Sequence, residues 1–79
     1  MKIPRKKTVT VRHYRGQEYI GERQYKQKTK FVEDLHQYLA LTDRWVEVDG
    51  PSGMTCTLGK IKGRTGVPKA DISMTWDLA

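Results

Sequence analysis

The chain has 79 residues with 15 basic and 9 acidic side chains, a net charge of +6 at pH 7, and 37% hydrophobic residues. This length allows one domain with a small core, and the hydrophobic share is above that of disordered chains. No apolar run approaches the roughly 20 residues of a membrane span, and the single cysteine excludes an internal disulfide framework. We therefore expect a small cytoplasmic protein without a membrane partner.

The basic N-terminus predicts an arm ahead of one folded domain. Residues 1–7 combine a proline with four cations, which is typical of a flexible arm, and residues 8–79 are expected to form a single domain. Some DNA-binding domains use such arms to reach phosphates or the minor groove. A frayed terminus without a function is the alternative.

Residues 8–15 and 18–27 predict a β-hairpin. Residues 8–15 alternate and are rich in β-branched side chains, and Gly16-Gln17 supplies a turn before the returning strand. One face of the first strand holds Val9, Val11 and His13, and the other holds Thr8, Thr10, Arg12 and Tyr14. The pattern places the valines in the core and the arginine with the tyrosine on the opposite face.

The phase of the returning strand stays open. If Ile20 faces the core, Glu18 and Glu22 face it too, which is costly without partners. If the tyrosines of this strand face the core, Arg23 does so as well. Gly21 in the middle of the strand indicates a bulge that would reset the phase and relieve the conflict.

Residues 30–41 carry the clearest helical pattern. Their apolar side chains recur at helical spacing and form one stripe, which consists of Phe31, Val32, Leu35, Tyr38 and Leu39. Thr29 is the expected N-cap. Burying such a stripe contributes roughly 1.5–3 kcal/mol per side chain, so this helix should supply much of the core.

The second half of the chain predicts further strands at residues 44–48, 54–61 and 72–78, with a turn at 49–53 and a loop at 63–69. Met54, Cys56 and Leu58 share one face, and the last strand would turn Ile72, Met74, Trp76 and Leu78 inward. The order ββαβββ predicts an α+β fold, a single two-layer domain whose mostly antiparallel sheet has one helix on one face.

The sequence carries no catalytic or metal-binding motif. A zinc site needs about four Cys, His or carboxylate ligands at close spacing, and one cysteine with two distant histidines does not supply them. Cys56 is expected in the core, and neither His13 nor His36 has a partner for acid–base chemistry. We therefore expect a protein that is not an enzyme and has no cofactor.

Positive charge is concentrated in the first 30 residues. They hold ten basic and two acidic side chains, whereas residues 31–50 hold one basic and five acidic ones. A field of one sign attracts a partner of opposite charge, and nucleic acid is an abundant polyanion. Binding to DNA or RNA is the first hypothesis. An acidic host protein and a merely solubilising surface are the alternatives.

The predicted site combines the arm with the hairpin surface and a second basic group near residue 60. A sheet covered on one side leaves its other face open, where arginines would bind phosphates and tyrosine rings would stack on unpaired bases. The predicted nucleic-acid-binding residues are Arg5, Lys6, Lys7, Arg12, Tyr14, Arg15, Tyr19, Arg23, Tyr25, Lys26, Lys28, Lys30, Lys60, Lys62 and Arg64. Insertion of the two-stranded ribbon into a DNA major groove is an alternative mode.

A second hypothesis is an inhibitor or adaptor of the kind that phages and mobile elements encode. Such a protein would bind a host protein through a sheet edge or exposed aromatic side chains, because free edges pair with other strands and Trp, Tyr and Arg dominate binding hot spots. Trp45 would contribute if it points outward. A sheet edge that pairs with itself would instead give a homodimer.

Overall fold

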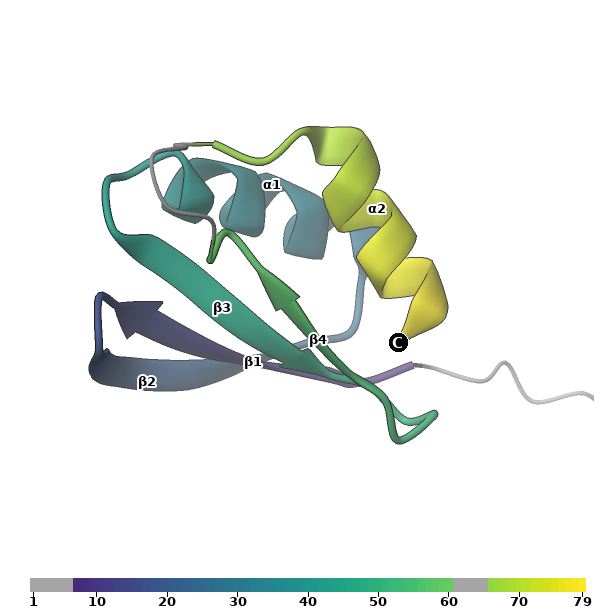
Figure 1. Ribbon diagram of the computed structural model, residues 1–79. Coiled ribbons are helices and arrows are strands. Elements are labelled where there is room, and N and C mark those ends of the chain that lie inside the picture. Colours follow the sequence, from purple (N-terminus) through teal and green to yellow (C-terminus); the bar gives the residue numbers. More distant parts are fainter. Residues whose placement is uncertain (1–6, 61–65) are drawn as a thin grey trace, which may run out of the picture.

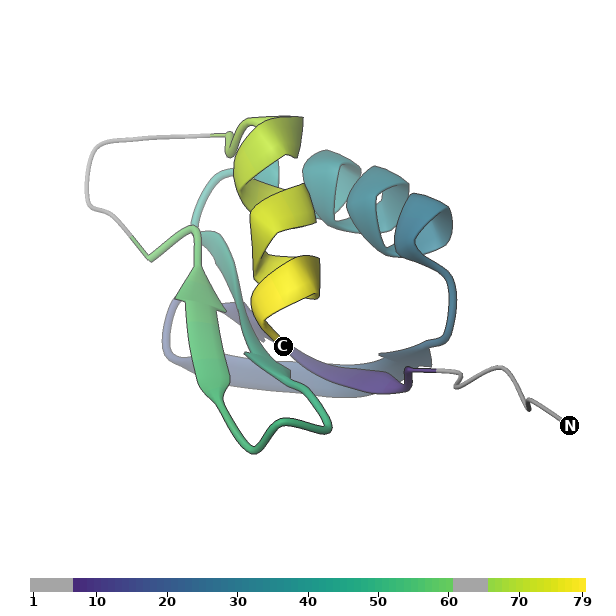
Figure 2. The same ribbon diagram turned by 90° about the vertical axis from the view of Figure 1, so that its right-hand side faces the viewer.

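The computed structural model describes residues 7–60 and 66–79. Its elements in chain order are β1 (Val9–Arg15), β2 (Glu18–Tyr25), α1 (Lys28–Leu39), β3 (Arg44–Asp49), β4 (Thr55–Leu58) and α2 (Lys69–Leu78). The strands form one antiparallel sheet in the order β2-β1-β3-β4. Both helices lie on the same face of this sheet, and no described element covers the other face (Figures 1 and 2). The predicted α+β class and antiparallel sheet are confirmed.

A bulge in β2 settles the phase that the sequence left open. His13 pairs with Gly21 and the next residue, Tyr14, pairs with Tyr19, so Ile20 is an extra residue in β2. Residues that pair directly across an antiparallel ladder share a face of the sheet. The insertion therefore changes the phase along β2, as the glycine in the middle of the strand indicated.

The bulge gives each face of β2 side chains that suit it. Beyond the bulge, Tyr25 lies opposite Val9 on the helix side and is buried, whereas Glu22 lies opposite Arg12 on the other face. Before the bulge, Tyr19 also lies on the face away from the helices. Neither uninterrupted phase is adopted: Tyr25 shares the helix side with Arg23, whose side chain stays exposed, and Tyr19 lies on the other face.

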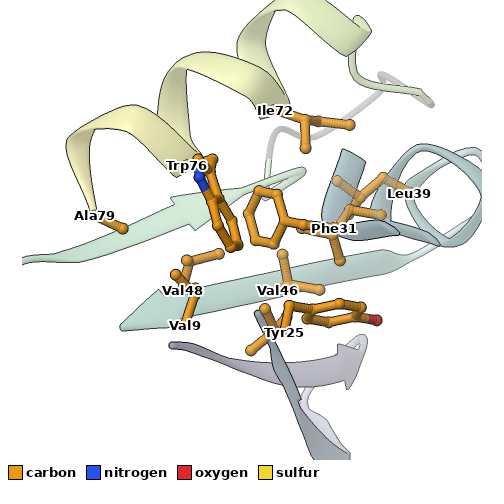
Figure 3. Packing of buried hydrophobic residues seen from close by; sticks show 11 residues of the cluster. Val9, Tyr25, Phe31, Leu39, Val46, Val48, Ile72, Trp76 and Ala79 are labelled. Atoms are coloured by element: carbon orange, nitrogen blue, oxygen red, sulfur yellow. The ribbon is translucent and has the colours of Figure 1, made fainter. Parts of the chain in front are cut away.

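The core lies between the helices and the sheet. The α1 side chains Phe31, Leu35 and Leu39 are buried against Val9, Val11, Val46 and Val48 of the sheet and against Ile72 and Trp76 of α2 (Figure 3). The Phe31 ring centroid is 5.0 Å from that of Trp76 and 5.8 Å from that of Tyr25. The predicted apolar stripe of α1 is confirmed. The predicted N-cap is wrong, because the helix already begins at Lys28, and Gln27 before it makes no side-chain cap.

The last predicted strand is wrong, since residues 69–78 form the helix α2. The apolar residues of this segment occupy alternate positions, which fits a strand. Ile72, Thr75, Trp76 and Ala79 also recur at helical spacing, and these are the buried ones. A short apolar run fits both periods, and packing against α1 decides between them.

The fourth strand is shorter than predicted. β4 covers Thr55–Leu58, with Cys56 and Leu58 partly buried against the core. Met54, which was expected to begin this strand on the face of Cys56 and Leu58, precedes it and is exposed. Of the predicted arm, residues 1–6 lie outside the described residues, whereas the ammonium of Lys7 contacts the backbone oxygen of Trp76. Neither described helix has the length and apolar character of a membrane span.

Two alanine substitutions distinguish a helix from a strand in the last segment. Ile72 is fully buried, so Ile72→Ala should lower the free energy of unfolding by about 2–5 kcal/mol through lost contacts and a new cavity. Met74 is exposed, so Met74→Ala should change that free energy by less than about 0.5 kcal/mol. Urea unfolding followed by circular dichroism measures both. Equal losses would contradict the helix, because a strand would turn both side chains inward.

Candidate functional site

The face of the sheet away from the helices, which we call the open face, carries alternate side chains of all four strands. The ladder registers align them in rows across the strands. The first row is Tyr19, Tyr14 and Trp45, the second is Glu22, Arg12, Glu47 and Thr57, and the third is Gln24, Thr10, Asp49 and Thr55. The prediction that Arg12 and Tyr14 lie opposite the buried valines is confirmed.

The first row, which we call the aromatic row, is a continuous series of ring contacts. The rings of Tyr14 and Trp45 stack with centroids 4.1 Å apart and an interplanar angle of 8°. Tyr19 meets Tyr14 edge to face at 5.6 Å. On the other side, the ammonium of Lys60 lies 4.3 Å from the centre of the Trp45 ring. Such aromatic and cation–π contacts contribute about 0.5–1.5 kcal/mol each and hold the rings in place.

The ring contacts leave little room for bases to stack on the aromatic row. Because β1 and β4 flank β3 on opposite sides, Tyr14 and Lys60 cover opposite faces of the Trp45 indole. A stacking platform needs free ring faces, as in single-strand-binding sheets. Here Trp45 and Tyr14 stand against one another and turn their edges outward, so the predicted role of Tyr14 as a platform finds no support.

The second and third rows neutralise the arginine of the open face. The Arg12 guanidinium donates to Glu47 Oε1 at 3.2 Å and also contacts Asp49 Oδ2. This guanidinium holds the pKa of the Asp49 carboxyl below its ordinary value. With Glu22 and Lys60, the open face holds three carboxylates and two cations, so it is not the basic surface that was predicted. The pairing of β1 with β3 places carboxylates from the acidic middle of the chain beside the arginine.

Other lysines belong to two chain segments that lie side by side at one end of the sheet, which we call the basic end. Val9 pairs with Tyr25, so the start of β1 lies beside the connection from β2 to α1 (Figures 1 and 2). The lysines around these two chain segments are Lys7, Lys26, Lys28 and Lys30. Four of the predicted residues thus belong to adjacent chain segments, a placement that strand alternation did not indicate.

The lysines of the basic end differ in their partners. The ammonium of Lys28 donates to Asp77 Oδ1 at 3.0 Å, in an exposed ion pair. The ammonium of Lys7 contacts the backbone oxygen of Trp76 near the C-terminal end of α2. It also lies 5.5 Å from the centre of the Trp76 ring. The other two lysines are exposed to solvent. Exposed ion pairs contribute at most about 1 kcal/mol, so an incoming phosphate can compete with Asp77 for Lys28.

The remaining predicted residues do not join this group. Arg23 lies on the helix side, with its guanidinium 3.5 Å from the Asp34 carboxylate, and Arg15 is exposed at the opposite end of β1. Tyr25 is buried, and its hydroxyl donates to Asp34 at 3.1 Å. Tyr19 and Lys60 belong to the open face. The other four, Arg5, Lys6, Lys62 and Arg64, lie outside the described residues.

The sequence did not predict a hollow that lies between the β2 bulge and the end of α1. It is lined by Ile20, Arg23, Asp34, Tyr38 and Leu41 around the half-buried His13. The imidazole lies edge to face against the Tyr38 ring at 4.8 Å, and burial lowers the pKa of His13 from its ordinary value of 6.5. No local pattern indicated the hollow, because bulge and helix meet only in the folded chain.

Two residues of the open face, Trp45 and Glu47, were not predicted as site residues. The alternation in residues 44–48 could have placed them together on that face.

In comparisons with protein-family models, with curated proteins and with solved structures, the chain matches none of them. Within residues 7–60 and 66–79, no three His, Cys, Asp or Glu side chains come together as metal ligands. The functional conclusions therefore depend on the two surfaces described above, the basic end and the open face.

The environment of His13 predicts how stability depends on pH. Burial favours the neutral imidazole in the folded state, so the unfolded chain takes up a proton first as the pH falls below about 6.5. The free energy of unfolding should therefore decrease from pH 7 to pH 5. In His13→Gln this decrease should be smaller, whereas His36→Gln should retain it. Urea titrations at each pH measure the effect, and equal slopes for His13→Gln and the parent chain would contradict it.

Proposed function

We propose that the protein binds nucleic acid through its basic end, by contacts to the phosphate backbone. The observation that carries the proposal is the pairing of Val9 with Tyr25, which places the start of β1 beside the three lysines that follow β2. The basic N-terminal segment therefore joins the folded body at the point where those lysines lie. Lysines bind phosphates as point charges, without reading the sequence of bases.

The distribution of charge between parts of the chain supports the proposal. Residues 7–60 and 66–79 hold ten basic and nine acidic side chains, so they are nearly neutral as a whole. Residues 1–6 and 61–65 hold five basic side chains and no acidic one. Much of the net positive charge thus belongs to residues 1–6 and 61–65 and not to the strands of the sheet. The segment 1–6 continues directly from Lys7, a member of the basic end.

The proposed role is binding without catalysis. Phosphates are common to DNA and RNA, so contacts of this kind serve either nucleic acid, single- or double-stranded. We place this role in the cytoplasm, because the single cysteine, Cys56, is a free thiol and free thiols persist in a reducing compartment. The open face takes no part in it, since its carboxylates would repel phosphates.

Fluorescence anisotropy with labelled oligonucleotides tests this proposal. Affinity should fall steeply between about 50 and 200 mM salt, because each neutralised phosphate releases counterions. The double substitution Lys26→Gln/Lys30→Gln should weaken binding to all sequences alike. It should also reduce the slope of log K against log salt by about one per lost phosphate contact.

A double variant with the same charge provides the matched control. Arg15→Gln/Lys60→Gln also removes two positive charges, but from the opposite end of β1 and from the open face. It should leave the salt slope close to that of the parent chain. Absence of binding at the lower salt concentration would refute the proposal. Equal losses in both double variants would show a diffuse attraction by net charge and no site at the basic end.

A further inference from the structure

The open face is an ordered surface that the basic end does not use. The Trp45 indole nitrogen donates to the Gly16 oxygen at 2.6 Å, and the Tyr14 hydroxyl donates to Glu47 Oε1 at 3.0 Å. Together with the ring stacking, these hydrogen bonds fix the aromatic row before any partner arrives. Side chains that are already fixed lose little conformational entropy on binding. Tryptophan, tyrosine and arginine, which this face brings together, are the residues enriched in protein–protein hot spots.

The aromatic row presents ring edges to solvent and forms an apolar ridge. Neighbouring strands lie about 4.8 Å apart, so rings that stack at 4.1 Å with an 8° angle must stand upright on adjacent strands. Their edges then point away from the sheet. Tyr19 ends the row at the edge strand β2 and is 52% exposed. Aliphatic side chains of a partner can pack against such edges, whereas bases need ring faces.

The charges beside the apolar ridge indicate which kind of molecule can bind the open face. Glu22, Glu47 and Asp49 outnumber Arg12 in the second and third rows, and Arg12 is already held by two of these carboxylates. A nucleic acid would bring phosphates toward the carboxylates. The open face of a second copy would bring the same three carboxylates against them. Both arrangements are repulsive, whereas lysine or arginine side chains of another protein would be attracted.

We propose that the open face is a docking surface for another protein, which presents aliphatic side chains flanked by lysine or arginine. The aliphatic groups pack on the aromatic row, with Tyr19 at its accessible end. The cationic groups pair with Glu22 and with the oxygen of Glu47 that Arg12 and Tyr14 leave free. This interaction is separate from nucleic-acid binding, because the two surfaces share no residue.

Random peptides displayed on phage, selected on the immobilised full chain, test the proposal directly. Selected peptides should combine aliphatic residues with lysine or arginine. Their affinity should fall at least about tenfold on Tyr19→Ala, because that ring is the accessible end of the ridge. It should fall by roughly threefold to tenfold on Glu22→Gln, with a weaker dependence on salt. Both side chains are exposed, and circular dichroism verifies that the variants fold.

Matched substitutions on the helix side serve as controls. Met74→Ala removes an equally exposed apolar side chain and Glu33→Gln an exposed carboxylate, and neither should change the affinity. Enrichment of acidic peptides, or affinities that Tyr19→Ala leaves unchanged, would overturn the proposal.

Two other results would assign the open face to a different occupant and also overturn the proposal. One is a concentration-dependent dimer, seen by analytical ultracentrifugation, that Tyr19→Ala abolishes. The other is oligonucleotide binding that Tyr19→Ala abolishes while Lys26→Gln/Lys30→Gln retains it.

Discussion

The extra residue in β2 is the constraint on which the rest of the structure depends. Tyr19 and Tyr25 are an even number of residues apart, so in an uninterrupted strand both would point to the same face. The insertion at Ile20 sends Tyr25 into the core beside Phe31 and leaves Tyr19 in the aromatic row. It also places Glu22 on the open face. The division of Tyr19 and Tyr25 between the open face and the core is thus a consequence of a single irregularity in one edge strand.

The charges are distributed differently along the sequence and in the folded structure. Along the sequence, a basic first third precedes an acidic middle. In the fold, β1 lies between β2 and β3, so Arg12 meets carboxylates from that middle segment. Residues 7–60 and 66–79 are nearly balanced in charge, with ten basic and nine acidic side chains. A surface that looks cationic in sequence is therefore mildly acidic on the sheet.

The two proposed surfaces differ in the physics of recognition. The basic end has lysines before β1, after β2 and in the first turn of α1, which suits non-specific contacts to phosphates that weaken with salt. The open face has side chains fixed by stacking and hydrogen bonds, which suits a partner of defined shape and composition. The two surfaces share no residue, so the two proposed functions together would let one chain hold a nucleic acid and a protein. The protein would then connect the two partners without carrying out a reaction itself.

The sequence by itself determined the elements whose periodicity is long or unambiguous. The α1 stripe, the β1 alternation and the bulge at Gly21 could all be predicted, because each depends on local spacing and backbone preference. The tertiary structure decided three things: that residues 72–78 are helical, that Arg12 is neutralised, and that the start of β1 lies beside the end of β2, from which Lys26 follows. A short apolar run fits the period of a strand and that of a helix, and only its packing against the core decides between them. The partners of a charge depend on strand order, which brings together residues far apart in the chain.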